Sequence, residues 1–296
     1  MGRIVSVTAN PLLDHIAEVP WRHGAVSRTS TISRIVGGKG LNVARVLARH
    51  GHDCTAVCLG GGSEADELVR LIAADGVRPE LVRTDARLRI GFQLADQQAG
   101  TVACIEEGFR VTTAERERFI AAVAATLPGS DLCIISGSVP DLGMEDVYRR
   151  LADAAAAARV PCWIDSYGKP MFAALAGANP PALAKPNRLE YGGDPQAWLA
   201  ARELHLTDGG AQVTVRAPEG RWRVVPPEVS EVNAIGSGDC WLAGYAHGRL
   251  SGWDIPRSLA WAAAAGAANA SRVEIARIGP EDVRPLIDRV QVVQAP

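Results

Sequence analysis

Helical and strand patterns alternate along most of this 296-residue chain, and this alternation is the feature that most restricts its fold. Short apolar runs typical of strands lie at residues 3–9, 54–60, 131–137 and 161–166. Runs with a helical spacing of apolar residues lie at 41–51, 63–76, 114–127 and 144–160. Such alternation predicts a mostly parallel sheet with helices on both faces. We expect residues 1–296 to form a single α/β domain.

Two stretches, 15–36 and 88–107, break the alternation. Both contain short runs with a period of two residues, separated by turns, and neither shows a helical period. The second stretch reads as a hairpin about a turn near Gly100. We expect residues 11–36 and 87–107, taken approximately, to form a small antiparallel sheet that acts as a lid.

The bulk composition narrows the class of protein. A hydrophobic fraction of 47% and a charged fraction of 22% are typical of a soluble globular protein. The net charge of −2 gives no general reason to bind nucleic acid or an anionic membrane. No stretch is long and apolar enough to cross a bilayer. We therefore expect neither nucleic acid nor a membrane among the partners.

The cysteines and the first segment of the chain bear on its compartment. The six cysteines lie mostly in apolar, strand-like segments and show no paired CxxC spacing. This usage is typical of reduced core residues and not of a disulfide framework or a zinc site. The segment MGRIVSVTAN alternates like a strand and lacks the long apolar core of a signal peptide. Both observations predict a cytoplasmic protein.

The segment NAIGSGDC, residues 233–240, places Asp239 directly after Gly236, Ser237 and Gly238. The apolar spacing that follows predicts a helix that begins at this turn. A helix N-terminus has unpaired N–H groups and a partial positive charge, so it favours an anion. The glycines let a ligand approach the backbone. Because Asp is also a preferred N-cap, a purely structural role for Asp239 stays open.

The segment IVGGKGLNVARVL, residues 35–47, reads as a strand, a glycine turn and the start of a helix. It matches neither the Walker A pattern nor GxGxxG. Gly37, Gly38 and Gly40 would let a polyhydroxylated ligand lie against the backbone, and Asn42 offers both a donor and an acceptor. A tight turn between strand and helix is the alternative.

The segment AKPNRLE, residues 184–190, contains a candidate metal site. Pro186 discourages helix before Asn187, so we expect Asn187 and Glu190 to lie one helical turn apart on the same face. An amide oxygen and a carboxylate suit Mg²⁺ that is bound largely through its waters. A surface helix capped by the asparagine is the alternative.

Five segments, in this order and spacing, resemble the ribokinase-like PfkB sugar kinases over nearly the whole chain. They are TANPLLD (8–14), GGKGLNVAR (37–45), SGSVP (136–140), KPNRLE (185–190) and GSGD (236–239). The first two are most similar to the 1-phosphofructokinase and tagatose-6-phosphate kinase subgroup. The resemblance implies a ribokinase-like three-layer α/β/α fold with a mostly parallel central sheet and a small antiparallel β lid.

The resemblance also implies roles for individual residues. Asp239 matches the catalytic base, and the amides of Gly236, Ser237 and Gly238 match an anion hole. The residues expected at the sugar phosphate are Asp14, Gly38, Lys39, Asn42, Arg89, Arg28 and Ser138. Those expected at the nucleotide are Lys185, Asn187, Glu190, Thr207 and Gly209. Asn187 and Glu190 would organise Mg²⁺ through its water shell.

Arg89 matches the arginine that grips the existing phosphate of the sugar. The planar guanidinium suits this task because it binds phosphate oxygens in pairs. Arg28 is a second candidate for the role, and Arg87 is the fallback. The implied activity is ATP- and Mg²⁺-dependent phosphorylation of fructose 1-phosphate to fructose 1,6-bisphosphate, with fructose 6-phosphate or tagatose 6-phosphate as alternative substrates. We expect a homodimer.

The departures from the family pattern fall on the nucleotide side. Asn233 and Ala234 stand before the glycine turn where the family has other residues, and residues 190–207 form a shorter interval than in relatives. The nucleotide loop is reduced to TDGGAQ, residues 207–212. A non-catalytic sugar-phosphate-binding homologue with an impaired nucleotide site is therefore the alternative. A Rossmann dehydrogenase lacks its glycine fingerprint here.

Overall fold

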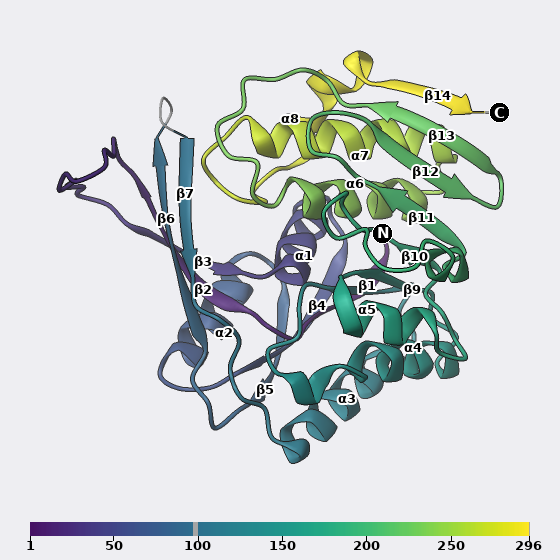
Figure 1. Ribbon diagram of the computed structural model, residues 1–296, viewed down its shortest axis with the longest axis horizontal. Helices are drawn as coiled ribbons and strands as arrows, with labels where there is room; N and C mark the ends of the chain where they lie inside the picture. Colours follow the sequence, from purple (N-terminus) through teal and green to yellow (C-terminus); the bar gives the residue numbers. More distant parts are fainter. Residues whose placement is uncertain (97–99, 296) are drawn as a thin grey trace.

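The computed structural model describes residues 1–96 and 100–295, and its centre is a ten-stranded sheet (Figure 1). The strands are β1 Arg3–Thr8, β4 Asp53–Gly60, β5 Arg78–Arg83, β8 Leu132–Ser136, β9 Cys162–Asp165, β10 Leu183–Ala184, β11 Glu203–Leu206, β12 Val213–Ala217, β13 Gly220–Val225 and β14 Gln291–Ala295. Their order is β14-β13-β12-β11-β10-β9-β8-β1-β4-β5. All pairs from β11 to β5 are parallel, and those from β11 to β14 are antiparallel. The mostly parallel sheet is confirmed.

The helices cover both faces of this sheet. The helices of one face are α1 Lys39–Arg49, α2 Glu64–Ala74, α6 Ser237–Leu250, α7 Ile255–Ala270 and α8 Pro280–Val283. Those of the other face are α3 Thr113–Thr126, α4 Val147–Ala157 and α5 Gly168–Leu175. The short 3₁₀ helices are η1 Leu142–Met144, η2 Ala197–Ala200 and η3 Arg284–Arg289. Figure 1 shows α6 and α7 on the opposite side of the sheet from α3 and α4.

The two helical layers enclose two hydrophobic cores because consecutive strand residues point to opposite faces of the sheet. In β1, Ile4 packs into the core with α1 and α6, whereas Val5 packs into the core with α3 and α4. Both residues are at most 1% exposed. Because β1 is buried on both faces, apolar residues occur on both of its sides, which made the strand predictable from the sequence.

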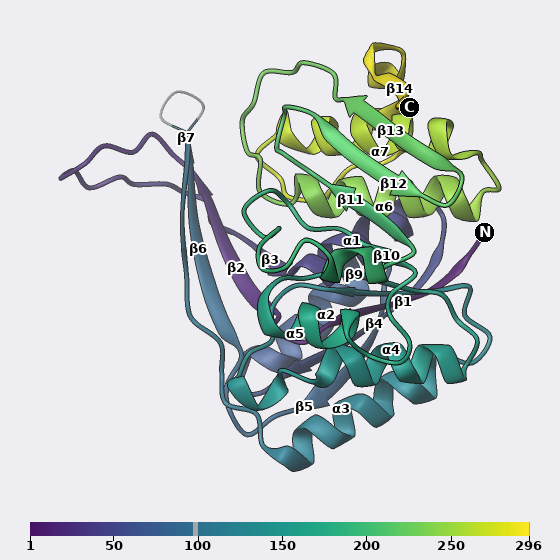
Figure 2. The same ribbon diagram turned by 45° about the vertical axis from the view of Figure 1, so that its right-hand side comes forward.

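The lid is a separate four-stranded sheet in the described chain, made of β2 Leu12–Glu18, β3 Ser33–Gly37, β6 Arg89–Asp96 and β7 Gly100–Ile105. Figure 2 shows it standing beside the main sheet. The outer pairs β2–β3 and β6–β7 are antiparallel as expected, but the central pair β2–β6 is parallel. The turn of the predicted hairpin lies outside the described residues, and Asp96 pairs with Gly100 on either side of it.

The cysteines are largely core residues, as expected. Five of them are buried and free, and burial raises the pKa of the Cys54 and Cys58 thiols to about 12. Cys104 is the exception, because it lies exposed on β7 of the lid. A search of the described helices finds none with the length and hydropathy needed to cross a membrane.

Candidate active site

A cleft of about 700 Å³ opens where the parallel strands end at their carboxyl edge. Its floor includes Asp165 at the end of β9 and Lys185 just after β10, and Asp14 and Arg89 of the lid line it as well. Ligands of open α/β sheets bind at this edge because the loops and helix N-termini converge there. The cleft therefore brings the sequence motifs of both sheets together.

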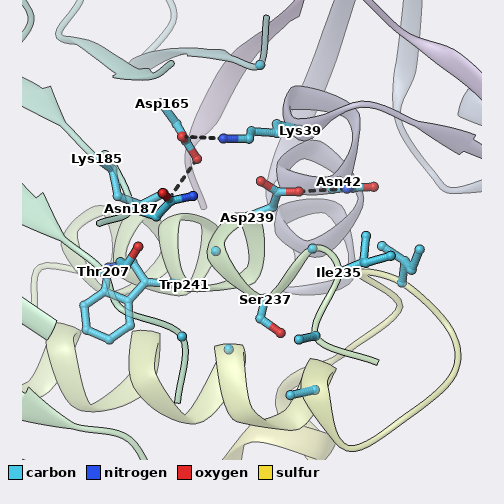
Figure 3. Close-up of a pocket in the computed structure, with 18 of the residues that line it drawn as sticks. Lys39, Asn42, Asp165, Lys185, Asn187, Thr207, Ile235, Ser237, Asp239 and Trp241 are labelled. Atoms are coloured by element: carbon cyan, nitrogen blue, oxygen red, sulfur yellow. Dashed lines mark hydrogen bonds and ion pairs between the residues drawn. The ribbon is translucent and has the colours of Figure 1, made fainter. Parts of the chain in front are cut away.

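Asp239 lies in the first turn of α6, lines the cleft and is only 5% exposed. The N-cap of α6 is Gly236, which adopts a left-handed conformation with φ 82°. A Cβ at this position would lie 2.7 Å from Ile275. Asp239 is therefore not the cap of the helix. Its Oδ2 accepts a hydrogen bond from Asn42 Nδ2 at 2.8 Å (Figure 3).

The surroundings of Asp239 bring its pKa close to neutral pH. Burial and the nearby charge of Asp165 raise the pKa of Asp239 to about 7, against the opposing influence of Lys39, Asn42 and Lys185. A carboxylate with a pKa near the working pH is suited to general base catalysis, since it is both available as a base and able to take a proton.

A lysine and carboxylate cluster lies next to Asp239. Lys39 Nζ is 3.1 Å from Asp165 Oδ1 and 2.6 Å from Glu190 Oε1, and Lys185 Nζ is 2.9 Å from Asp165 Oδ2. Figure 3 shows Asp165 between the two lysines. Burial lowers the pKa of Lys39. The negative charges of Asp165, Asp239 and Glu190 outweigh this effect, so the pKa of Lys39 lies above its ordinary value. Lys39 therefore faces the cleft as a cation, and the fully buried Asp165 holds both lysines in place.

Asp165 is a site residue that the sequence reasoning missed. Its side chain is fully buried. Burial alone would raise the pKa of Asp165, but Lys185 and Lys39 outweigh this and hold the pKa below its ordinary value. The available signal was an acid at the carboxyl end of the apolar run CWID, where strands of a parallel sheet deliver residues to the ligand edge.

The predicted helix after Pro186 is wrong. Residues 187–190 form a turn in which Asn187 Oδ1 accepts from the amides of Leu189 at 2.9 Å and Glu190 at 2.8 Å. Glu190 Oε2 in turn accepts from the Asn187 amide at 3.0 Å. The chain cannot continue as a helix because Gly193 has φ 73° and Pro195 follows. The two side chains still meet, as the spacing implied.

Three buried amide or carboxylate oxygens on or next to the lid strands have no hydrogen-bond partner within the described chain. They are Asn10 Oδ1, Asp14 Oδ1 and Gln93 Oε1, and all three residues line the cleft. Gln93 Nε2 donates to Asp14 Oδ2, and burial raises the pKa of Asp14. Asn10 Nδ2 donates to Ser138 Oγ at 3.1 Å. Because buried polar atoms are normally paired, this wall is suited to ligand hydroxyl groups.

Asn10 and Gln93 were also missed by the sequence reasoning. Asn10 lies inside the quoted segment TANPLLD, and Gln93 alternates with exposed residues along β6. A polar residue with a period of two on a lid strand was the signal for Gln93.

The two candidate arginines lie in different places. Arg89 lines the cleft at the root of the lid, where its guanidinium donates to the carbonyl oxygens of Asn10 at 2.7 Å, Glu106 at 3.1 Å and Pro11 at 3.3 Å. Arg28 is exposed in the segment between β2 and β3 and is not among the residues that line the cleft. The structure therefore brings Arg89 to the site and leaves Arg28 outside it.

The glycines of the GGKG segment serve two purposes. Gly40 allows α1 to pack on β1, since a Cβ there would lie 2.5 Å from the Val7 carbonyl oxygen and closer still to Thr8. Gly38 lines the cleft with φ 123°, a conformation that favours glycine. The tight-turn interpretation explains Gly40, whereas Gly38 offers its backbone to the cleft.

The far end of the cleft is lined by Thr207, Gly209 and Gly210 together with residues 226–229 and the C-terminal half of α7. Thr207 is bridged to Asn187, so the turn at 187–190 adjoins this end. In the described chain the interval 190–207 holds only η2 and β11. Asn233, one of the departures from the family pattern, stabilises the approach to α6 because its Oδ1 accepts from the Ile235 amide at 3.0 Å.

The sequence of the chain was compared with known families. A model described as pfkB family carbohydrate kinase matches residues 3–278. The chain belongs to this family. It is a carbohydrate kinase, an enzyme that transfers phosphate to a hydroxyl group.

Individual relatives carry the names of phosphofructokinases. The chain is 28% identical to 1-phosphofructokinase of Escherichia coli (strain K12) over 274 residues, 84% of each protein. It is 27% identical to ATP-dependent 6-phosphofructokinase isozyme 2 of Mycobacterium tuberculosis over 284 residues, 90% of this chain and 83% of the relative.

The fold is shared with solved structures. The crystal structure of a possible 1-phosphofructokinase from Thermotoga maritima matches with a TM-score of 0.89 at 20% identity, over 99% of this chain and 100% of that one. The expected ribokinase-like architecture is thereby confirmed. Within this kinase fold, Asp239 and the three unpaired acceptors lie along the same cleft.

Proposed function

We propose that this kinase transfers the γ-phosphate of ATP to fructose 1-phosphate and forms fructose 1,6-bisphosphate. The observation that carries the proposal is Asp239, a buried carboxylate with a pKa of about 7 at the N-terminus of α6, in a cleft whose other wall presents unpaired acceptors. A base near neutral pH beside a hydroxyl-binding wall is what transfer to a sugar hydroxyl requires.

In the proposed reaction Asp239 accepts the proton of the attacking sugar hydroxyl while that oxygen bonds to the γ-phosphorus and the bond to ADP breaks. Charge that develops on the phosphoryl oxygens is stabilised by the α6 N-terminus and by Lys39 and Lys185. The Ser237 amide already donates to the Ala234 carbonyl at 3.1 Å, so we assign the anion hole to the amides of Gly236 and Gly238. Closure of the lid excludes water and prevents hydrolysis of ATP.

The residues present fit Mg²⁺ in an outer coordination role. The described residues contain no group of three or more His, Cys, Asp or Glu side chains able to hold a metal ion. Each oxygen of Glu190 already accepts a hydrogen bond, one from Lys39 and one from the Asn187 amide. We propose that Glu190 and Asn187 would hold Mg²⁺ through its waters, and that the ion would supply positive charge beside the phosphates of ATP.

A coupled ADP-release assay tests the substrate. It compares fructose 1-phosphate, fructose 6-phosphate, tagatose 6-phosphate and free fructose at saturating Mg-ATP. We expect kcat/KM to be highest for fructose 1-phosphate, because relatives named 1-phosphofructokinase and the paired TANPLLD and GGKGLNVAR segments point to that subgroup. A higher kcat/KM for either 6-phosphate would replace the proposed substrate by that one.

The short interval 190–207 favours a second candidate, a sugar-phosphate binder that has lost productive nucleotide binding. Titration calorimetry with a non-hydrolysable ATP analogue and Mg²⁺ distinguishes the two. We expect the analogue to bind; sugar-phosphate binding without nucleotide binding would favour the second candidate.

We predict that Arg89→Ala weakens the use of phosphorylated sugars and spares unphosphorylated ones. Arg89 lines the cleft, and its hydrogen bonds within the described chain use three of its five N–H donors. Loss of a charge-assisted contact to phosphate should raise KM about 10- to 100-fold with little change in kcat. Steady-state kinetics with fructose 1-phosphate and with fructose measure the difference.

Arg87→Ala is the matched control for Arg89→Ala. Arg87 lies two residues away, is exposed, and pairs with Glu106 at 2.6 Å outside the cleft. Its substitution should leave KM unchanged. An equal loss for both sugars in Arg89→Ala would mean that Arg89 supports the lid and does not bind phosphate.

We propose that residues 1–296 act as one domain with the lid described above, and that two copies form a homodimer. The lid presents exposed apolar side chains at Phe92, Leu94, Val102 and Ile105, which suits association. Sedimentation of the purified chain measures the oligomeric state.

A further inference from the structure

Arg45 is a buried cation that the proposed mechanism leaves unused. It lies on α1, and its side chain is 0% exposed. Its Nε donates to Asp75 Oδ2 at 2.6 Å, and its Nη2 donates to the Val36 carbonyl oxygen at 2.6 Å. An arginine buried this completely needs every such partner, since the loss of its hydration is otherwise costly. Its Nη1 donates to the Ile275 carbonyl oxygen at 3.4 Å and also to a residue of the active site.

That contact fixes the orientation of the Asn42 amide. Arg45 Nη1 donates to Asn42 Oδ1 at 3.0 Å, and Asn42 Nδ2 donates to Asp239 Oδ2 at 2.8 Å. A guanidinium has only donors, so the atom that faces it must be the amide oxygen. The amide nitrogen is then forced toward Asp239. A flipped amide would place an acceptor against the carboxylate and a donor against the guanidinium.

Asp75 holds Arg45 in this position from another helix. It is the C-cap residue of α2, with a side chain that is 7% exposed. A carboxylate is disfavoured at a helix C-terminus, because the macrodipole there is negative. The ion pair with Arg45 explains why Asp75 lies there. Arg277 Nη2 lies 3.4 Å from the other carboxylate oxygen of Asp75. The series of contacts through Asp75, Arg45, Asn42 and Asp239 thus runs from the C-terminus of α2 to the cleft.

We propose that Arg45, held by Asp75, is a positioning residue that orients Asn42 and through it the carboxylate of Asp239. This inference rests on the proposed role of Asp239 as the base. Arg45 is not among the residues that line the cleft, and it acts only through Asn42. The same guanidinium binds Val36 of β3, so it also anchors the root of the lid beside the base.

The test is the pH profile of kcat/KM for Arg45→Lys and Asp75→Asn, which reports the pKa of the base in the free enzyme. Lysine keeps the charge beside Asp75 but lacks the fork that reaches Asn42 and Val36 together. We expect kcat at pH 7 to fall about tenfold in Arg45→Lys, with KM for the sugar phosphate within about twofold. We expect the acid limb of the profile to move up by about one pH unit, because a carboxylate that loses a hydrogen-bond donor holds its proton more tightly.

The groups that face Asp239 from other elements stay constant in this comparison. They are Asp165 of β9, Lys39 of α1 and Lys185 after β10. Arg277→Met is the matched control, because Arg277 contacts the same Asp75 but does not contact Asn42. We expect its kcat and acid limb to equal those of the wild type. A general loss of stability would lower the activity of all three variants without moving the acid limb.

The outcomes separate this inference from the proposed function. An acid limb that is unchanged in folded Arg45→Lys, while the wild type phosphorylates sugar and Asp239→Asn does not, overturns the inference alone. A wild type without kinase activity on any sugar phosphate overturns the proposed function. If Arg45→Lys does not fold, Asp75→Asn decides: an upward shift of its acid limb supports the positioning role, and an unshifted limb overturns it.

Discussion

Replacing Asp239 with asparagine should lower kcat by about 10² to 10⁴, the usual effect of removing a general base. Asn keeps the size of the side chain and its place on α6, so binding of the sugar phosphate should change little. Stopped-flow or coupled measurement of ADP release at saturating substrates gives kcat directly. Near-normal turnover in Asp239→Asn would remove Asp239 from the role of base.

The pH dependence provides a second readout of the same residue. Burial and the charge of Asp165 raise the pKa of Asp239 to about 7, so the free enzyme should lose kcat/KM as the pH falls below 7. The slope should approach tenfold per pH unit. Asp239→Asn should lack this inflection in whatever activity remains, because its side chain does not titrate.

Stability measurements control for misfolding of Asp239→Asn. The pKa of Asp239 is higher in the folded chain than its ordinary value of 3.8. The folded chain therefore binds this proton more tightly, and the stabilisation is present below pH 3.8 and lost as the pH rises through 7. At pH 8 the variant lacks the buried charge and should be at least as stable as the wild type in urea. If Asp239→Asn were less stable than the wild type at pH 8, its loss of activity would be explained by misfolding.

The strands and helices of the core were predictable because their patterns are local. β1 carries apolar residues on both of its faces, at Ile4, Val5 and Val7, because both faces are buried. The spacing of apolar residues after Asp239 predicted α6 directly after the glycine turn. The parallel pairing of β2 with β6 was not predictable. It joins strands more than 70 residues apart, and each strand alone has the same period of two in either direction. The helix expected after Pro186 does not form because Gly193, with a positive φ, and Pro195 follow within a few residues.

The site was predictable where glycines and polar residues cluster in the sequence, as around Asp239 and Lys39. Asp165 and Arg45 were missed because each is a single charged residue within an apolar run, and only the tertiary fold supplies its partners. Arg28 shows the reverse case. Its residue type suits phosphate binding, but the path of the chain between β2 and β3 leaves it outside the cleft.

The second large effect is expected at Asp165. Asp165→Asn leaves Lys39 and Lys185 beside a neutral side chain, and breaking a buried ion pair from one side typically costs about 3–5 kcal/mol. Urea unfolding at pH 8, where Asp165 is ionised in the wild type, measures the loss. We expect kcat to fall about 100-fold as well, because the two lysines lose the partner that aims them at the cleft.

Glu145→Gln is the matched control for Asp165→Asn. It also removes the acid of a lysine pair, Lys169 to Glu145 at 2.9 Å, but that pair is exposed and should contribute less than about 1 kcal/mol. Its kcat should equal that of the wild type.

The acid limb of kcat/KM distinguishes an electrostatic role of Asp165 from a purely structural one. The charge of Asp165 raises the pKa of Asp239, so its removal should move the acid limb of Asp165→Asn to lower pH, opposite to the shift expected for Arg45→Lys. Lys39 and Lys185, freed from Asp165, would strengthen this shift because the charge of each lysine lowers the pKa of Asp239. An acid limb that stays at its wild-type position in folded Asp165→Asn would show that Asp165 supports the fold without setting the charge of the base.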